Sequence, residues 1–133
     1  DDKILLDAQK RGIVTLGPHK YANLPQLYRD HDVFVFPSVS ETFGHPMAEA
    51  MSTGLPVVAS DTPVNLEICG EAASYFKPFS ALGLADRIAE LNNSEALRNR
   101  LSGEGRHRAV SRYSWEDHVD RLVDSFEAVA SCR

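Results

Sequence analysis

VFVFPSVSETFGHPMAEAMSTGLPVVAS, residues 33–60 of this 133-residue chain, joins two short apolar runs through a glycine-containing loop and a helical stretch. The runs at 33–36 and 56–60 are apolar without alternation, which predicts strands buried on both faces, as in a parallel sheet. Between them the sequence predicts a helix over 46–53, with Pro46 at its first position and Gly54 just past its end. This order of strand, helix and strand predicts a crossover unit of an α/β fold.

The sequence on both sides extends the α/β pattern. Apolar runs at 13–16 and 73–76 predict two more strands, which makes about four in all. A helix is predicted over 24–30 with Asn23 as its N-cap, and residues 1–11 predict a helix before the first strand. We therefore expect a Rossmann-like parallel sheet flanked by helices, half of a doubly wound fold.

Only helices are predicted after the last strand. The 3.6-residue spacing of apolar side chains predicts amphipathic packing helices over 81–91 and 115–129, the second with Ser114 as its N-cap. The aromatic side chains of Trp115 and Phe126 fall on the apolar face of the second helix, so we expect them to pack in the interior.

The stretch between these two helices, residues 94–111, is helical in composition. Gly103 and Gly105 predict a kink or break within it. Five arginines lie from Arg98 to Arg112, which predicts a solvated helix face. A weaker alternative for them is attraction to anionic lipid at the inner face of a membrane.

Charge and composition exclude several classes of protein. Fourteen basic and 19 acidic side chains give a net charge of -5, and 43% hydrophobic residues suit one globular domain over residues 1–133. Nucleic acid is not an expected partner, because it needs a basic face. No apolar run approaches the roughly 20 residues of a membrane-spanning helix, and the chain does not begin like a signal peptide.

The two cysteines, Cys69 and Cys132, lack metal-ligand spacing. They are predicted to be free thiols in a reducing compartment, with one disulfide as the alternative. We therefore expect a cytoplasmic protein.

The loop 37–45 and the helix after it form the candidate binding site. In an open parallel sheet, ligands bind at the carboxyl ends of the strands, where helix amino ends point into the crevice. The free amides of His45, Met47 and Ala48 are expected to form a site for phosphate or pyrophosphate there. The other histidines lie too far apart in the sequence to predict a metal site, and no metal is expected.

Glu41 and Glu49 flank this predicted anion site. Because a carboxylate repels phosphate, their expected partners are hydroxyl groups of a bound sugar and ribose. Gly44 would let a ligand approach the backbone closely. Together these features fit a nucleoside diphosphate sugar. An alternative stays open for Glu49, because an acid near a helix amino end complements the helix dipole whether or not it binds a ligand.

Residues 38–61, SVSETFGHPMAEAMSTGLPVVASD, resemble the signature of the group 1, or GT4, family of retaining glycosyltransferases with the GT-B fold. That signature is two glutamates separated by seven residues, an aromatic residue and glycine between them, and an E-A-M-x-x-G-x-P-V-V-A-S/T tail. Its elements here are Glu41, Phe43-Gly44, Glu49-Ala50-Met51, Gly54 and Pro56-Val57-Val58-Ala59-Ser60. Flanking segments at 14–17 and 67–70 also resemble the family, so the resemblance covers nearly the whole chain.

The resemblance implies the carboxyl-terminal, donor-binding domain of a GT-B enzyme. Glu41 would be its catalytic residue and would bind hydroxyls of the donor sugar, helped by the amides of Phe43 and Gly44. Catalysis would consist of holding the donor and stabilising charge on the leaving phosphate, with retention through a front-face path. Pyrophosphate would be bound by His45, Met47 and Ala48, ribose by Glu49, and the base would be bordered by Gly17, Pro18 and His19.

The implied reaction transfers a hexosyl group from a UDP-, GDP- or ADP-sugar to a sugar, glycan or lipid-linked acceptor, in polysaccharide or glycoconjugate biosynthesis. No cofactor beyond this donor, and no catalytic metal, is implied. The acceptor-binding amino-terminal domain is absent from the sequence, as are the first strands of the donor domain and the Arg and Lys that clamp pyrophosphate. We therefore expect a fragment that is inactive alone.

Two other functions remain alternatives. One is a non-catalytic nucleotide-binding or interaction module that keeps the GT-B fold. The other is a sugar-nucleotide epimerase of the same architecture, which the two-glutamate pattern and its E-A-M tail disfavour.

Overall fold

A parallel sheet of three strands organises the computed structural model, which describes residues 2–131. The middle strand pairs with one neighbour through Phe34 opposite Val57, and with the other through Val58 opposite Ser74. The strands are β1 (Phe34–Phe36), β2 (Val57–Ser60) and β3 (Ala73–Phe76), in the spatial order β1-β2-β3. The predicted α/β class and three of the four predicted strands are confirmed.

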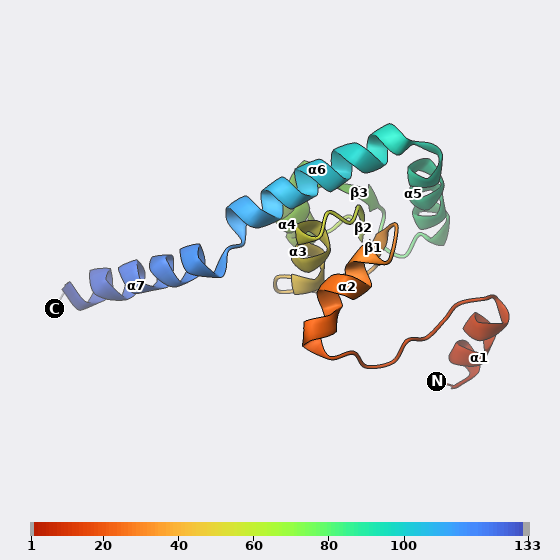
Figure 1. Cartoon of the computed structure of the whole chain (residues 1–133), viewed down its shortest axis with the longest axis horizontal. Coiled ribbons are helices and arrows are strands. Elements are labelled where there is room, and N and C mark those ends of the chain that lie inside the picture. Colours follow the sequence, from red (N-terminus) through yellow and green to blue (C-terminus); the bar gives the residue numbers. More distant parts are fainter. Residues whose placement is uncertain (1, 132–133) are drawn as a thin grey trace.

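Helices connect the strands and cover both faces of the sheet (Figure 1). Each predicted helix is present, with its ends within two residues of the prediction. The helices are α1 (Asp2–Lys10), α2 (Leu24–Arg29), α3 (His45–Ser52), α4 (Pro63–Cys69), α5 (Ala81–Asn93), α6 (Glu95–Arg112) and α7 (Trp115–Ser131), with short 3-10 turns η1 (Tyr21–Asn23) and η2 (Gly70–Ala72).

The middle strand β2 is buried along its whole length. Val57 and Ala59 belong to a buried cluster with Met51 of α3, on one face of the sheet. Val58 points to the other face and is buried with Leu91 of α5. Because successive side chains of a strand point to opposite faces, one short strand contributes buried side chains to both apolar layers.

The predicted strand at 13–16 is wrong. These residues lie in an extended, exposed connection between α1 and η1, and the side chain of Val14 is 75% exposed (Figure 1). A strand needs a neighbouring strand that pairs with its backbone, and none lies beside this segment within residues 2–131. The β-branched residues of this segment therefore gave the apolar pattern of a strand, but these residues do not form one.

The predicted break at Gly103 and Gly105 is also wrong, because α6 is continuous. Gly105 is buried against α3, and a Cβ at this position would lie 3.2 Å from Cγ of Met51. The glycine therefore lets two helices approach closely. The low helix propensity of glycine led to the predicted break, but close packing against α3 compensates for it.

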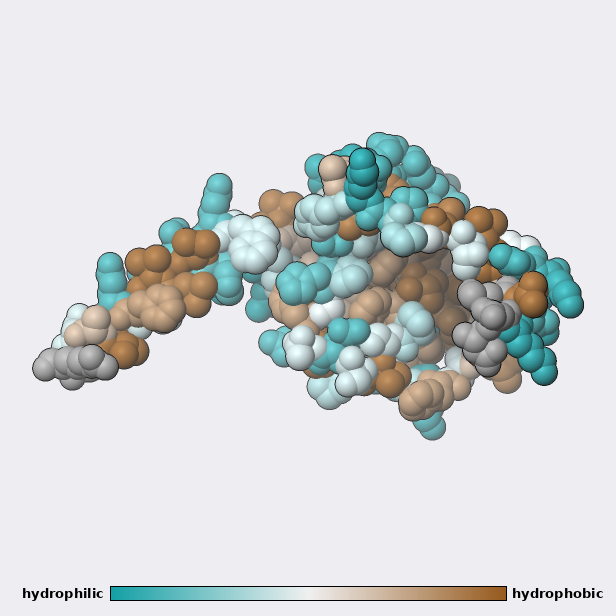
Figure 2. All heavy atoms as spheres, turned by 90° about the horizontal axis from the view of Figure 1, so that it is seen from below, coloured by the Kyte–Doolittle hydropathy of each residue, from teal (hydrophilic) through white to brown (hydrophobic). Residues whose placement is uncertain are grey.

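The packing predicted for α7 does not occur within the described residues. The helix points away from the body of the molecule, and apolar side chains line one of its faces (Figures 1 and 2). Trp115 and Phe126 are 72% and 70% exposed, and no residue of α7 is buried. Amphipathic spacing predicted the helix correctly, but the pattern does not say which surface will cover its apolar face. Of the helices within residues 2–131, none is both long and apolar enough to cross a bilayer.

Side-chain caps begin three of the helices on which the core depends. Thr62, Ser80 and Ser94 accept hydrogen bonds from amides in the first turns of α4, α5 and α6. Asn23 precedes α2 as predicted, but its side chain makes no capping hydrogen bond. Ser114 caps α7 as predicted, accepting from the Asp117 amide at 3.4 Å.

The two glycines of α6 give a matched test of this packing. Gly103→Ala adds a methyl group where no atom lies within 4 Å, and better helix propensity should raise the free energy of unfolding by about 0.5–1 kcal/mol. Gly105→Ala presses against Met51, and overpacking should lower it by about 1–3 kcal/mol. Chemical denaturation of both variants measures the difference. An equal gain in the two would show that α3 and α6 are not closely packed.

Candidate functional site

The loop 37–44 carries the chain from the carboxyl end of β1 to the amino end of α3, as predicted. Gly44 ends this loop with a left-handed backbone at φ 77°. A Cβ at this position would also lie 2.5 Å from Cε of Met47, which is closer than any real contact. Glycine is therefore favoured here by the left-handed turn into α3, and an added Cβ would in addition require the end of the Met47 side chain to shift.

The three amides predicted to bind pyrophosphate lie in the first turn of α3, but they are not equivalent. The Met47 amide donates to the Gly44 carbonyl oxygen at 3.0 Å, so it already has an acceptor within the chain. The Met47 side chain is fully buried, with its sulfur 3.6 Å from Sγ of Cys69. His45 is exposed and Ala48 half-buried. The His45 amide has no acceptor in the helical i−4 pattern, whereas the i−4 residue of Ala48 is Gly44, the N-cap of α3.

Glu49 is held by a residue that the sequence analysis missed. The Tyr28 hydroxyl, on α2, donates to Oε2 of Glu49 at 2.9 Å. The ring of Tyr28 is itself held edge-on by Phe34, at 5.6 Å between ring centres. Burial, with the hydrogen bond and the negative charge of Glu49, raises the pKa of Tyr28 well above its usual range. The phenol therefore remains a donor, and Oε1 of Glu49 is left for another partner.

Glu41 lies in the same loop and is half-buried. Within residues 2–131, its carboxylate has no hydrogen bond or ion pair. Two residues further on, the ring of Phe43 packs against His45 at 4.8 Å and edge-on against Tyr113 at 5.3 Å. Tyr113 follows α6 and was also missed from the sequence.

A buried polar network fixes the start of this loop. The Ser60 hydroxyl at the end of β2 donates to the Ser38 carbonyl oxygen. Asn65 of α4, which is fully buried, donates through Nδ2 to the Ser60 carbonyl and hydroxyl oxygens at 2.8 and 2.9 Å. Its Oδ1 has no partner within the described residues. The loop therefore leaves β1 along a path set by β2 and α4.

Gly17, Pro18 and His19, predicted to border the base, lie in the exposed connection that precedes η1. Within the described residues, no hydrogen bond or ring contact joins them to loop 37–44 or to α3. The structure thus brings Glu41, Phe43, Gly44, the first turn of α3 and Glu49 together along one segment, but does not bring the predicted base residues to them.

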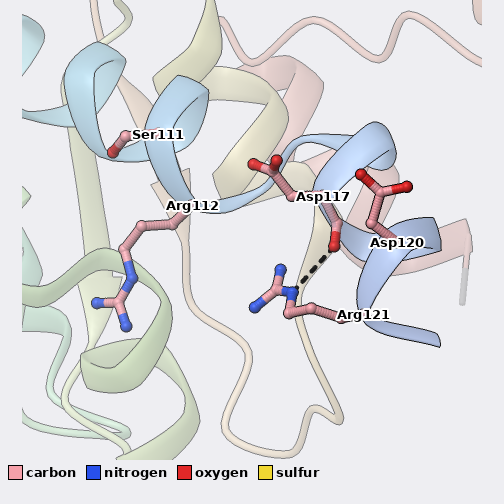
Figure 3. Close-up of a pocket in the computed structure, with 5 residues that line it drawn as sticks. All are labelled: Ser111, Arg112, Asp117, Asp120 and Arg121. Carbon is pink, nitrogen blue, oxygen red and sulfur yellow. Dashed lines mark hydrogen bonds between the residues drawn. The ribbon is translucent and has the colours of Figure 1, made fainter. Parts of the chain in front are cut away.

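Two surface hollows lie outside this segment. The larger, of about 440 Å³, lies where α6 ends and α7 begins, and the Arg121 Nε donates to the Asp117 carbonyl oxygen in it at 3.0 Å (Figure 3). Its lining is Ser111, Arg112, Asp117, Asp120 and Arg121. The second, of about 290 Å³, lies beside Tyr28 and Pro56. No predicted site residue lines either hollow, so neither is the candidate site.

No group of three or more His, Cys, Asp or Glu side chains within residues 2–131 could hold a metal ion. Cys69 is a free, buried thiol, and Cys132 lies outside the described residues. Burial raises the pKa of the Cys69 thiol to about 12, against a smaller lowering by Arg108. The thiol is therefore neutral at ordinary pH and acts as a packing group beneath α3.

The family follows from the sequence as a whole. The model of the family "Glycosyl transferases group 1" matches residues 3–108, which include β1 to β3 and the candidate site. The chain belongs to the group 1 glycosyltransferases.

Curated relatives match most of this chain. The O-antigen chain mannosyltransferase B of Escherichia coli is 30% identical over 132 residues, which are 96% of this chain and 34% of that protein. The chain spans about a third or less of the length of the curated relatives it matches.

The fold also matches larger solved proteins. A sucrose-phosphate synthase of Thermosynechococcus elongatus superposes with a TM-score of 0.90 at 24% identity, over 99% of this chain and 35% of that one. HepE of Anabaena, solved with UDP and glucose, superposes with a TM-score of 0.85 at 18% identity, over 96% of this chain and 36% of that one. The architecture is that of the GT-B glycosyltransferases, as the sequence predicted.

The buried thiol beneath α3 predicts a pH dependence of stability. In a Cys132→Ser background, the unfolded chain loses the Cys69 proton near pH 9 whereas the folded chain keeps it to about pH 12. The unfolding free energy should therefore fall as the pH rises, by about 1 kcal/mol between pH 9 and 10 from this group. Denaturation at both pH values, with Cys69→Ala as the control, isolates the contribution. An equal fall in the control would mean that the thiol is not buried as described.

Proposed function

We propose that this chain supplies the donor site of a glycosyltransferase that moves a hexosyl group from a nucleoside diphosphate sugar to an acceptor, with retention. The observation that carries the proposal is the arrangement of one segment: a left-handed glycine, an exposed helix amino end and two glutamates, at the carboxyl edge of a parallel sheet. The match to a structure that holds UDP and glucose supports this class of ligand, because that protein shares the fold.

The pyrophosphate is proposed to bind at the amino end of α3, through the amide of His45, with the other amides of the first turn contributing their positive partial charge. Helix amino ends offer donor groups and a positive partial charge to anions. α3 has no acidic side chain in its first turn that would neutralise this charge. As the bond to the sugar breaks, negative charge grows on the leaving diphosphate, and the same amides stabilise it.

The two glutamates are proposed to bind hydroxyl groups on either side of the pyrophosphate. Glu49 accepts from the ribose through the oxygen that Tyr28 leaves free, and Tyr28 positions it by holding the other oxygen. Glu41, which has no partner within the described residues, accepts from hydroxyls of the donor sugar next to the amides of Phe43 and Gly44. UDP-, GDP- and ADP-sugars all meet these requirements.

The acceptor is proposed to bind on a part of a longer protein. The chain matches only about a third of the length of its relatives, and this proposal assigns all residues of the candidate site to the donor. On this proposal the 133-residue chain binds the donor and does not transfer sugar alone. Steady turnover by this chain on any glycan or lipid-linked acceptor would contradict that part of the proposal.

A calorimetric titration of the chain with UDP, GDP and ADP tests the donor site. One nucleotide should bind saturably, and Glu49→Ala should weaken it about tenfold or more, since about 1.4 kcal/mol of hydrogen bonding to ribose is lost. Glu95→Ala is the matched control, because Glu95 is an exposed acid in the first turn of α6. If the folded chain binds none of the three nucleotides, or if both variants lose affinity equally, the proposed site is wrong.

Tyr28→Phe tests how Glu49 is positioned. Loss of the hydroxyl should lower the free energy of unfolding by about 1 kcal/mol and weaken nucleotide binding by a few fold, because Glu49 then has no fixed orientation. Denaturation and calorimetry measure the two effects. Tyr21→Phe, which alters an exposed tyrosine nearby, should change neither. Unchanged affinity in Tyr28→Phe would mean that the hydrogen bond does not serve the ligand.

A further inference from the structure

The loop 37–44, called the donor loop below, is held between Ser38 and Gly44 mainly by the aromatic ring of Phe43. Val39, Ser40 and Thr42 are exposed, whereas Phe43 is half-buried and packs against the buried core cluster that contains Met51, Val57 and Ala59. The backbone of residues 41–43 makes no hydrogen bond within the described residues. The place of the Phe43 ring therefore decides where the Glu41 carboxylate and the amides that follow it lie.

The ring of Phe43 is in turn held by Tyr113, 70 positions further along the chain. The two rings meet edge to face, with their centres 5.3 Å apart and their planes at 90°. This is a favourable geometry for an aromatic pair, because the positive edge of one ring meets the negative face of the other. Phe43 also packs against the His45 ring, with the ring centres 4.8 Å apart.

Tyr113 is fixed from two further directions. Its amide donates to the Ala109 carbonyl oxygen at 3.0 Å, at the end of α6. Its hydroxyl donates to the Ile68 carbonyl oxygen at 2.8 Å, near the end of α4, and Arg108 donates to the same oxygen at 2.7 Å. The ring that supports the donor loop is thus tied to two helices outside the loop.

We propose that Tyr113 is a positioning residue of the donor site, whose ring holds Phe43 so that Glu41 and the loop amides face the sugar of the donor. The proposal rests on the proposed function, because the sugar is the ligand that this part of the loop would contact. It assigns to Tyr113 an effect on the sugar end of the ligand. The nucleotide end depends on Glu49 and Tyr28 and should be affected less.

Two substitutions separate the ring contact from the hydroxyl. Tyr113→Phe keeps the ring edge and loses only the hydrogen bond to Ile68, whereas Tyr113→Leu keeps apolar bulk and loses the aromatic pair. Tyr75→Leu is the matched control. Tyr75 packs against the same core cluster and donates to the Gly70 carbonyl oxygen, just after α4, at 2.6 Å, but makes no ring contact with Phe43.

The first measurement needs no ligand. The proton NMR signal of the His45 ring, assigned with His45→Gln, reports the ring current of Phe43 packed against it. Tyr113→Leu should move this signal, whereas Tyr113→Phe and Tyr75→Leu should leave it in place. A loss of stability alone would not produce this pattern. An unmoved His45 signal in folded Tyr113→Leu would overturn the proposal.

The second measurement compares the dissociation constants of a nucleotide and its sugar conjugate, taking the nucleotide among UDP, GDP and ADP that binds. In Tyr113→Leu the conjugate should lose about three- to tenfold more affinity than the nucleotide, the range expected for an aromatic pair. Equal losses for the two ligands would overturn the positioning role alone. A wild-type chain that binds no nucleotide would overturn the proposed function as well, so the two failures are distinguishable.

Phe43→Leu provides the same test from the other side of the contact if Tyr113→Leu does not fold. It should reproduce the selective loss of affinity for the sugar conjugate. Equal losses of affinity for the nucleotide and its sugar conjugate in folded Phe43→Leu would overturn the positioning role.

Discussion

The burial of β2 on both faces is the constraint on which the rest of the structure depends. Val57 and Ala59 close one apolar layer and Val58 the other, so the helices on both sides are placed relative to one four-residue strand. The same strand ends at Ser60, whose hydroxyl donates to the Ser38 carbonyl oxygen in the loop after β1. Packing in the core is thereby transmitted directly to the start of the candidate site.

Buried Asn65 completes this link. Its Nδ2 donates to oxygens of Ser60, while its Oδ1 has no hydrogen-bond partner within residues 2–131. The loop is therefore held by a polar network at one end and by the left-handed turn of Gly44 at the other.

The sequence correctly predicted the elements whose structure is determined by residues close together in the chain. Local apolar runs predicted the strands at 33–36 and 56–60, and Pro46 and Gly54 predicted the ends of the helix between them. The structure contains all three elements. The segment 13–16 has the same local pattern but no partner strand within the described residues, so the pattern failed there. The break predicted at Gly105 was wrong for the opposite reason, because the role of this glycine is set by its contact with Met51 on a different helix.

The residues of the candidate site also differ in whether local sequence could predict them. Glu41, Gly44 and Glu49 lie within one short motif and could be placed from sequence, whereas Tyr28 and Tyr113 act across 21 and 70 positions and could not. Pairs so far apart meet only through the tertiary fold. A tyrosine hydroxyl or ring also leaves no distinctive spacing in the sequence, so only the tertiary structure shows that Tyr28 contacts Glu49 and that Tyr113 contacts Phe43.

These two supports suit the ligand chemistry proposed for the site. A chain with a net charge of -5 does not attract a diphosphate as a whole, so binding has to come from the local field at the start of α3, which acts over about one helical turn. Glu41 and Glu49 oppose free phosphate but accept from hydroxyl groups. On the proposed function, the site would therefore favour phosphates that carry a ribose on one side and a sugar on the other. Tyr28 holds Glu49 at one end of the motif by a hydrogen bond, and Tyr113 contacts Phe43 near Glu41 at the other.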